Sequence, residues 1–136
     1  MKIFSREVKV STTGRRELLD ITSEAKASVA ASGVTNGLCV IFSRHTTATV
    51  IVNENESGLR QDIMKKVEDS FPESGNWKHN RIDNNADAHL ACTFFGPSVS
   101  IPVVGGSLTL GTWQSIFLLE LDGPRSRSAL IEVIGE

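Results

Sequence analysis

The chain has little cysteine, no long hydrophobic run and no excess of charge of one sign. Its two cysteines, Cys39 and Cys92, lie in apolar stretches without metal-type pairing, which favours buried free thiols in a cytoplasmic protein. No apolar segment approaches the roughly 20 residues of a membrane-spanning helix. Basic residues number 14 and acidic residues 16, so the net charge is −2. Because nucleic acids and anionic membrane surfaces attract basic faces, we expect neither partner.

Several common catalytic motifs are also missing. The sequence has no P-loop, no G-x-G-x-x-G, no G-x-S-x-G and no C-x-x-C, which leaves nucleotide triphosphate, dinucleotide and dithiol chemistry without support. It contains no internal repeat, low-complexity tract or linker. With 136 residues, of which 40% are hydrophobic, the chain predicts a single domain spanning residues 1–136.

The hydrophobic pattern alternates between strand and helix types. Three segments have helical spacing and end signals; the third, capped by Asn85, is short. Residues 75–84 are polar and irregular, as in a loop. Strands are predicted at 3–12, 17–21, 37–42, 47–52, 98–103, 107–110, 114–121 and 128–134, and helices at 22–33, 56–71 and 86–95.

The last forty residues are almost entirely strand, separated by turns at Gly105-Gly106, Gly111 and residues 122–126. This order predicts an α+β fold dominated by antiparallel sheet, with two main helices and a short third helix. The segments 37–42 and 47–52 are apolar at both odd and even positions, which predicts strands covered on both faces. Polar loops flank these strands and predict a rim of functional side chains.

The three histidines, His45, His79 and His89, are the first candidates for chemistry. His45 follows a buried-type strand, His79 lies in the polar loop, and His89 opens the third helix. Imidazoles on a constrained loop and helix can converge on a divalent metal, and zinc with an open coordination position is a suitable occupant. The spacing is not a fixed ligand ladder, so separate surface or hydrogen-bonded histidines remain the alternative.

Further polar residues follow His45. Thr46 and Thr47 offer hydroxyls to a phosphate or an ordered water, or simply suit the edge of a strand. Asn53 and Glu54 either cap the second helix or face the same rim as His45, where a carboxylate could orient a histidine or bind magnesium.

The loop between the second and third helices holds Asp83, which is the best general acid or base candidate because it lies between two histidines. An Asx-turn role is the alternative. Trp113 fits the core better than a ligand platform. Trp77 suits either ligand stacking or attachment of the loop to the sheet.

Three stretches together carry a family resemblance: "HTTATVIVNE" (45–54), "WKHNRIDNNADAHL" (77–90) and "SVSIPVVGGSLTLGTWQSI" (98–116). The chain resembles the YjbQ family, which has been linked to a secondary thiamine-phosphate synthase activity. The resemblance covers essentially the whole chain. It implies a sandwich-like pair of sheets with helices outside, and a homotrimer with sites near the subunit boundaries.

The resemblance also implies a pocket in which His45, His79 and His89 bind a divalent metal. Zinc is the expected ion, and magnesium is an option with a diphosphate substrate. Asp83 and Glu54 occupy the acidic motif positions and are the catalytic candidates. The substrate-binding candidates are Arg44, Thr46, Thr47, Asn53, Asn85 and Gln114.

Three functions fit these residues. The first is a transferase that joins a pyrimidine diphosphate to a thiazole phosphate, which needs a cation and donors on the leaving diphosphate. The second is a non-catalytic trimer that binds a metal or a small phosphorylated ligand. The third is a metal-dependent hydrolase in which Asp83 activates water. An enzyme should lose rate without losing metal when Asp83 is replaced, whereas a binding protein should lose only ligand affinity.

Overall fold

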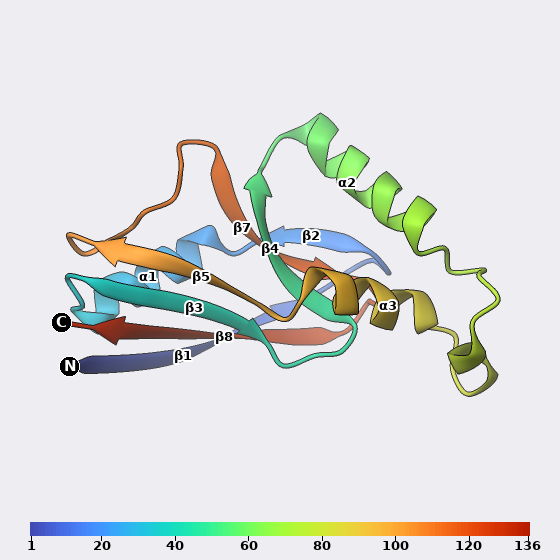
Figure 1. The fold of residues 1–136 in the computed structure, drawn as a ribbon, viewed down its shortest axis with the longest axis horizontal. Coiled ribbons are helices and arrows are strands. Elements are labelled where there is room, and N and C mark those ends of the chain that lie inside the picture. Colours follow the sequence, from blue (N-terminus) through green and yellow to red (C-terminus); the bar gives the residue numbers. More distant parts are fainter.

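A computed structural model describes all residues, 1–136. Eight strands and three α-helices follow each other along the chain, as the hydrophobic pattern predicts, and one short 3-10 helix lies within the predicted loop 75–84 (Figure 1). Their bounds are β1 (Lys2–Ser11), β2 (Glu17–Asp20), α1 (Thr22–Ser32), β3 (Gly37–Ser43), β4 (Ala48–Glu54), α2 (Ser57–Ser70), η1 (Lys78–Arg81), α3 (Ala86–Phe95), β5 (Ser98–Val104), β6 (Ser107–Leu108), β7 (Gln114–Glu120) and β8 (Ser126–Gly135).

The strands form two antiparallel sheets that pack against each other. The larger sheet has the order β1-β8-β3-β5-β6, and the smaller has the order β2-β7-β4. Every neighbouring pair is antiparallel. This is the predicted α+β fold. The two chain ends lie side by side at one end of the larger sheet (Figure 1), where the terminal amino group of Met1 is 3.1 Å from Oε1 of Glu136.

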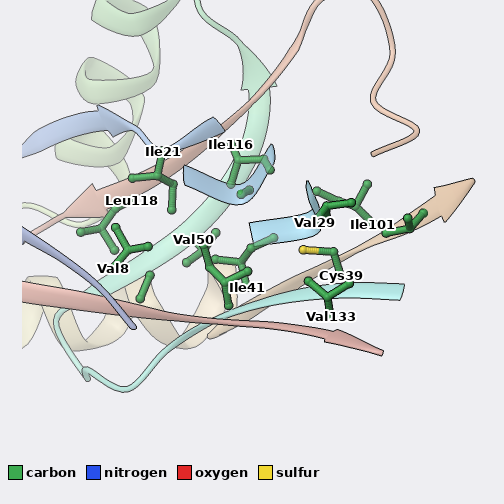
Figure 2. Packing of buried hydrophobic residues seen from close by; sticks show 14 of the residues in the cluster. Val8, Ile21, Val29, Cys39, Ile41, Val50, Ile101, Ile116, Leu118 and Val133 are labelled. Atoms are coloured by element: carbon green, nitrogen blue, oxygen red, sulfur yellow. The ribbon is translucent and has the colours of Figure 1, made fainter. Parts of the chain in front are cut away.

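The main hydrophobic core lies between the two sheets and includes the inner side of α1. Val8 and Ile41 of the larger sheet lie by Leu118 and Val50 of the smaller one, and Cys39 and Val133 lie near Val29 of α1 (Figure 2). A second cluster lies on the other face of the smaller sheet, under α2 and α3. Burial of these apolar side chains is the main favourable term in folding, at roughly 25 cal/mol per Å² of apolar surface.

The strand β7 separates the two cores. Ile116 and Leu118 point into the main core, while Phe117 and Leu119 point into the second. A strand covered on both faces needs apolar residues at successive positions, which explains the unbroken run IFLL. The strand β4 is covered in the same way, since Val50 joins the main core and Ile51 packs against the second.

The strand β3 departs from the prediction, because only one of its faces is covered. Cys39 and Ile41 are fully buried, but Leu38 and Phe42 on the opposite face are 39% and 37% exposed. The larger sheet therefore has an outer apolar face within one chain. No helix of the structure is long and apolar enough to cross a bilayer.

The helix ends also differ in part from the sequence prediction. Gly33 ends α1 with φ of 68°, a left-handed conformation that glycine adopts without a Cβ clash. Thr22 does not cap α1; its hydroxyl instead donates to Asp20 and accepts from the Ile116 N–H, which ties the helix to β7. The carboxylate of Glu56 caps α2 by accepting from two backbone N–H groups.

Candidate functional site

The turn between β3 and β4 holds His45 in a fixed position. The Ser43 hydroxyl donates to the Ala48 carbonyl at 2.6 Å and accepts from the His45 N–H, so it closes the turn on itself. The ring then reaches β8, where Nε2 accepts a hydrogen bond from the Ser128 N–H at 3.0 Å. Burial lowers the pKa of His45 below its usual value, and the positive charge of Arg127 lowers it further.

This hydrogen bond determines the tautomer of His45. A neutral imidazole has one nitrogen that accepts and one that carries a proton. Because Nε2 accepts from the Ser128 N–H, the proton lies on Nδ1. The neutral ring therefore offers an N–H donor at Nδ1, while its single lone pair is already used.

The helix α3 supplies the opposite side of the site. His89, Cys92 and Thr93 follow at spacings of three and four residues, which places them on one face of the helix. The helix lies against β4, and the Thr49 hydroxyl donates to the Gly96 carbonyl just after the helix ends. The Thr93 hydroxyl donates back to the His89 carbonyl at 2.8 Å.

A cavity of about 260 Å³ lies between this turn and α3. We call it the histidine–threonine cavity, and its polar lining consists of His45, Thr46, Thr49, His89, Cys92 and Thr93. Cys92 is no nucleophile at neutral pH, because burial raises the pKa of its thiol to about 12. Both cysteines are free, as predicted, but only Cys39 is fully buried and Cys92 is half-buried.

The predicted three-histidine centre is only partly assembled in one chain. The rings of His79 and His89 are adjacent, with centroids 4.8 Å apart and planes at 78°. His45 does not fit as a ligand, because its lone pair accepts from Ser128. No group of three or more histidine, cysteine, aspartate or glutamate side chains is placed to hold a metal. The pair His79 and His89 fits two ligands of an open site.

A buried ion pair lies beneath His45. Arg127, 4% exposed, contacts Oε1 of Glu120 at 2.6 Å, and its guanidinium also donates to the hydroxyl of Thr47 at 2.7 Å. Burial acts to raise the pKa of Glu120, but hydrogen bonds from Arg127, the Asp122 N–H and Thr12 hold it below its usual value. Thr47 therefore contacts this ion pair rather than the cavity, unlike its neighbour Thr46.

A second buried group of charges positions α3. Asp87, with no exposed surface, accepts from Arg15 at 3.0 Å and from Arg16 at 2.6 Å, which fastens the first turn of the helix to the β1–β2 turn. Asn85 lies nearby, and its Nδ2 donates to Asp122 at 2.8 Å. The Asn85 side chain does not cap α3, and its Oδ1 has no hydrogen-bond partner.

The remaining predicted site residues lie elsewhere in the single chain. Asn53 and Glu54 end β4, and Glu54 pairs in register with Gln114 at the start of β7. Glu54 comes six positions after Ala48 in β4, which is roughly 20 Å of extended chain. Trp113 directly precedes Gln114 and is 72% exposed, so the prediction that it joins the core is wrong.

Asp83 and Arg44 are both solvent-exposed. Oδ1 of Asp83 accepts from the N–H of the next residue, Asn84, at 2.8 Å, whereas an Asx-turn contact reaches the N–H two residues on. Neither side chain lines the histidine–threonine cavity. Trp77 attaches the loop to the end of α2, because its indole N–H donates to the Pro72 carbonyl at 3.1 Å.

Sequence reasoning missed Arg127 and Glu120, although the pattern contained a signal for both. In β8 the buried residues are Arg127, Ala129, Ile131 and Val133, so an arginine occupies a core position. Glu120 ends the fully buried run of β7. Two opposite charges at positions that an alternating pattern assigns to the core predict a buried pair. Thr49 and Thr93 gave no signal of this kind.

Comparison with known proteins shows to which family the chain belongs. A family model described as "UPF0047 protein YjbQ-like" matches residues 6–136. A "UPF0047 protein" of Methanothermobacter thermautotrophicus is 46% identical over 136 residues, covering 100% of this chain and 95% of its own. One of Archaeoglobus fulgidus is 41% identical over 128 residues, covering 94% and 99%.

Solved structures show the same fold. A crystal structure described as a YbjQ-like protein of unknown function from Sulfolobus solfataricus superposes with a TM-score of 0.98 at 47% identity and covers 99% of both chains. A hypothetical protein from Aeropyrum pernix gives a TM-score of 0.94 at 44% identity, covering 97% of this chain and 98% of that one. The chain thus belongs to the UPF0047 family of YjbQ-like proteins.

Proposed function

We propose that the chain binds a small phosphorylated molecule in the histidine–threonine cavity. The observation that carries this proposal is the meeting of two imidazoles, from His45 and His89, with the free hydroxyl of Thr46 in one cavity of about 260 Å³. Nδ1 of His45 is an N–H donor with its ring orientation already fixed by Ser128. Phosphate oxygens accept strong hydrogen bonds from such N–H donors, because a charged acceptor shortens and strengthens a hydrogen bond.

A divalent cation belongs to this proposal. His79 and His89 would hold it, zinc being suited to imidazole and magnesium arriving with a diphosphate. Once bound, the cation would neutralise charge on phosphate oxygens. His45 would act separately, by donating from Nδ1. Free Cys39 and Cys92 favour a cytoplasmic location for this protein.

The reaction proposed for this site is thiamine phosphate synthesis. The thiazole nitrogen forms a bond to the exocyclic methylene carbon of the pyrimidine, the bond from that carbon to the diphosphate oxygen breaks, and pyrophosphate leaves with the electron pair. The chain's part is to hold the leaving diphosphate with His45 and Thr46. Donors that match the charge developing on the leaving group lower the barrier.

The proposed homotrimer would give Glu54, a predicted catalytic carboxylate, a route to the cavity. Glu54 and Gln114 lie at the opposite end of β4 from His45 in one chain. In a trimer, a neighbouring copy would bring its own Glu54 and Gln114 to the cavity. This arrangement would unite the sequence-predicted residues that one chain keeps apart.

A second candidate function is ligand binding without turnover. It is favoured by the exposed position of Asp83, whose carboxylate contacts the Asn84 N–H and does not line the cavity. The cavity lining of one chain contains no carboxylate, so neither predicted catalytic carboxylate, Asp83 or Glu54, can act there unless another copy supplies it.

The test is a binding titration with inorganic pyrophosphate and magnesium, followed by an assay for thiamine phosphate. Thr46→Val should weaken pyrophosphate binding by about tenfold, the effect of losing one hydrogen bond to a charged group. Thr35→Val, at an exposed threonine before β3, is the matched control and should bind as the wild type does.

The outcomes separate the candidates. Thiamine phosphate formed above the rate without protein, and lost in His89→Gln, would support the transferase. Saturable binding without turnover would support the binding protein. Equal affinities of the two threonine variants, or no binding by the wild type, would overturn the proposed site. Metal content by elemental analysis should fall from one cation per chain to none in a His79→Ala, His89→Ala double variant.

A further inference from the structure

A second cavity lies on the other side of His45. Its volume is about 480 Å³, and Lys9, Ser11, Ser126 and Ser128 line it together with His45. The strands β1 and β8 form its floor. Because His45 also lines the histidine–threonine cavity, its ring stands between the two spaces. We call the second space the serine–lysine cavity.

Strand register explains why its polar groups meet. Lys9 pairs with Ser128, and Ser11 pairs with Ser126, across β1 and β8. Directly opposite residues on antiparallel strands point to the same face, so these four side chains converge. The next pair along the two strands, Val8 and Ala129, points into the main core on the opposite face.

The donors in this cavity are uncommitted. On the same face, the Ser5 hydroxyl donates a hydrogen bond to Glu132 at 2.9 Å. The hydroxyl groups of Ser11, Ser126 and Ser128 form no hydrogen bond. Lys9 forms no ion pair, unlike Lys65, whose Nζ is 2.6 Å from Asp69. Three hydroxyls and one ammonium group are therefore available to a ligand.

Charge limits what the ligand can be. Lys9 brings one positive charge, and the guanidinium of Arg127 below the cavity is already neutralised by Glu120 at 2.6 Å. Glu7 also lines the cavity, two residues from Lys9 on the same face of β1. A ligand that satisfies both side chains carries an anion for Lys9 and a hydrogen-bond donor for Glu7.

We propose that the serine–lysine cavity is a second binding subsite, which takes a phosphate monoester bearing an amino or hydroxyl donor. Lys9 and the serine hydroxyls bind the phosphate, and Glu7 binds the donor. The inference goes beyond the proposed function, because a phosphate monoester with such a donor is neither the diphosphate nor the thiazole phosphate of the proposed reaction. His45, with one edge toward each cavity, is then the residue that separates them.

The test uses amide chemical shifts, with O-phosphoethanolamine as the probe. The amide signals of Ser11 and Ser128 should shift saturably as the probe is added. Lys9→Gln should weaken this binding by about tenfold, as expected for loss of a charged hydrogen bond. Lys66→Gln, an exposed lysine on α2, is the control and should leave the affinity unchanged.

Glu7→Gln tests the donor half of the proposal. It should weaken binding of O-phosphoethanolamine while leaving the affinity for ethyl phosphate, which lacks the amino group, unchanged. Unmoved Ser11 and Ser128 signals, or equal affinities of the Lys9 and Lys66 variants, would overturn the subsite.

The two proposals fail separately. Pyrophosphate that shifts the Thr46 and Thr93 amides, with no response of Ser11 to O-phosphoethanolamine, would leave the proposed function standing and remove the second subsite. A response of Ser11 and Ser128 to O-phosphoethanolamine, without any response of Thr46 to pyrophosphate, would do the reverse.

Discussion

At the scale of single residues, His45 depends on one backbone hydrogen bond. The Ser128 N–H donates to Nε2, so protonation of that nitrogen would bring two donors face to face. Burial is the largest cause that lowers the pKa of this ring, and Arg127 adds to it, while Glu120 opposes both. A neutral His45 is therefore the state in which the turn, β8 and the two cavities fit together.

This arrangement predicts a pH dependence of stability. The pKa of His45 in the folded chain lies below the 6.5 of the unfolded chain, so the unfolded chain binds its proton first as pH falls. The free energy of unfolding should then decrease as pH falls through 6.5, and the decrease should end below the folded pKa. Thermal unfolding at a series of pH values measures it.

His45→Gln is the control for this prediction. The amide oxygen of glutamine can accept from the Ser128 N–H but does not titrate. The variant should therefore lose the part of the pH slope that His45 contributes. The same slope in the wild type and in His45→Gln would show that another group titrates, and would contradict the assignment of the tautomer.

At the scale of elements, α3 is positioned by charges rather than by a cap. Asp87 is fully buried and accepts from Arg15 and Arg16, both of which come from the turn before β2. Removal of one partner from a buried ion pair leaves charge without compensation. Asp87→Asn should therefore lower the free energy of unfolding by about 3 kcal/mol, measured by urea denaturation.

A matched control for Asp87→Asn is Asp69→Asn. Asp69 also accepts from a basic residue, Lys65, but both side chains are exposed. Exposed pairs contribute little because water and salt screen them, so the urea midpoint should not change. Asp87→Asn should in addition speed the modification of Cys92 on α3 by a thiol reagent, and Cys39 should be unaffected. Equal midpoints for the two variants would contradict the positioning role of Asp87.

Most elements could be predicted from the sequence because their signals are local. The run IFLL of β7 and the stop at Gly33 each depend on neighbouring residues, and both are confirmed. Because Leu38 and Phe42 are apolar, the sequence predicts that the outer face of β3 is covered. An apolar pattern does not indicate whether the same chain or another one covers that face. The core prediction for Trp113 is wrong for the same reason, because an apolar side chain does not itself indicate what would bury it.

The site was less accessible to sequence reasoning. His45 and His89 share a cavity only because α3 packs on β4. That contact depends on Asp87, whose partners Arg15 and Arg16 are more than seventy residues away. The use of the His45 lone pair by Ser128 is a contact across 83 residues. Such distant contacts leave no local pattern, so the roles of Asp83, Glu54 and the other predicted residues stay predictions.

At the scale of the whole molecule, the outer face of the larger sheet carries an apolar patch that no other part of the chain covers, next to the polar residues of the serine–lysine cavity. Register places Ile3 and Leu38 on either side of Ile134, and Phe42 beside Leu130. Ile3 is 67% exposed. An exposed apolar sheet face of this kind is typical of an interaction surface, and it supports the proposed homotrimer.

Leu38→Asp should therefore shift the chain from trimer to monomer, because a carboxylate buried at an interface lacks a partner. Light scattering after gel filtration measures the mass. Ile82→Asp is the control: Ile82 is 87% exposed but lies in the loop after η1. A wild-type monomer, or a Leu38→Asp trimer, would contradict this surface as the interface.

The double coverage of β7 has a consequence for how the chain comes apart. One hydrophobic cluster contains Phe117 and Leu119, and the other contains Ile116 and Leu118. Because both clusters pack on the same strand, neither can unfold without exposing apolar side chains of the other. The two halves should melt as one cooperative unit, with no intermediate that keeps a single core. A ligand that touches only α3 and the His45 turn would then protect every strand from heat, including those far from where it binds.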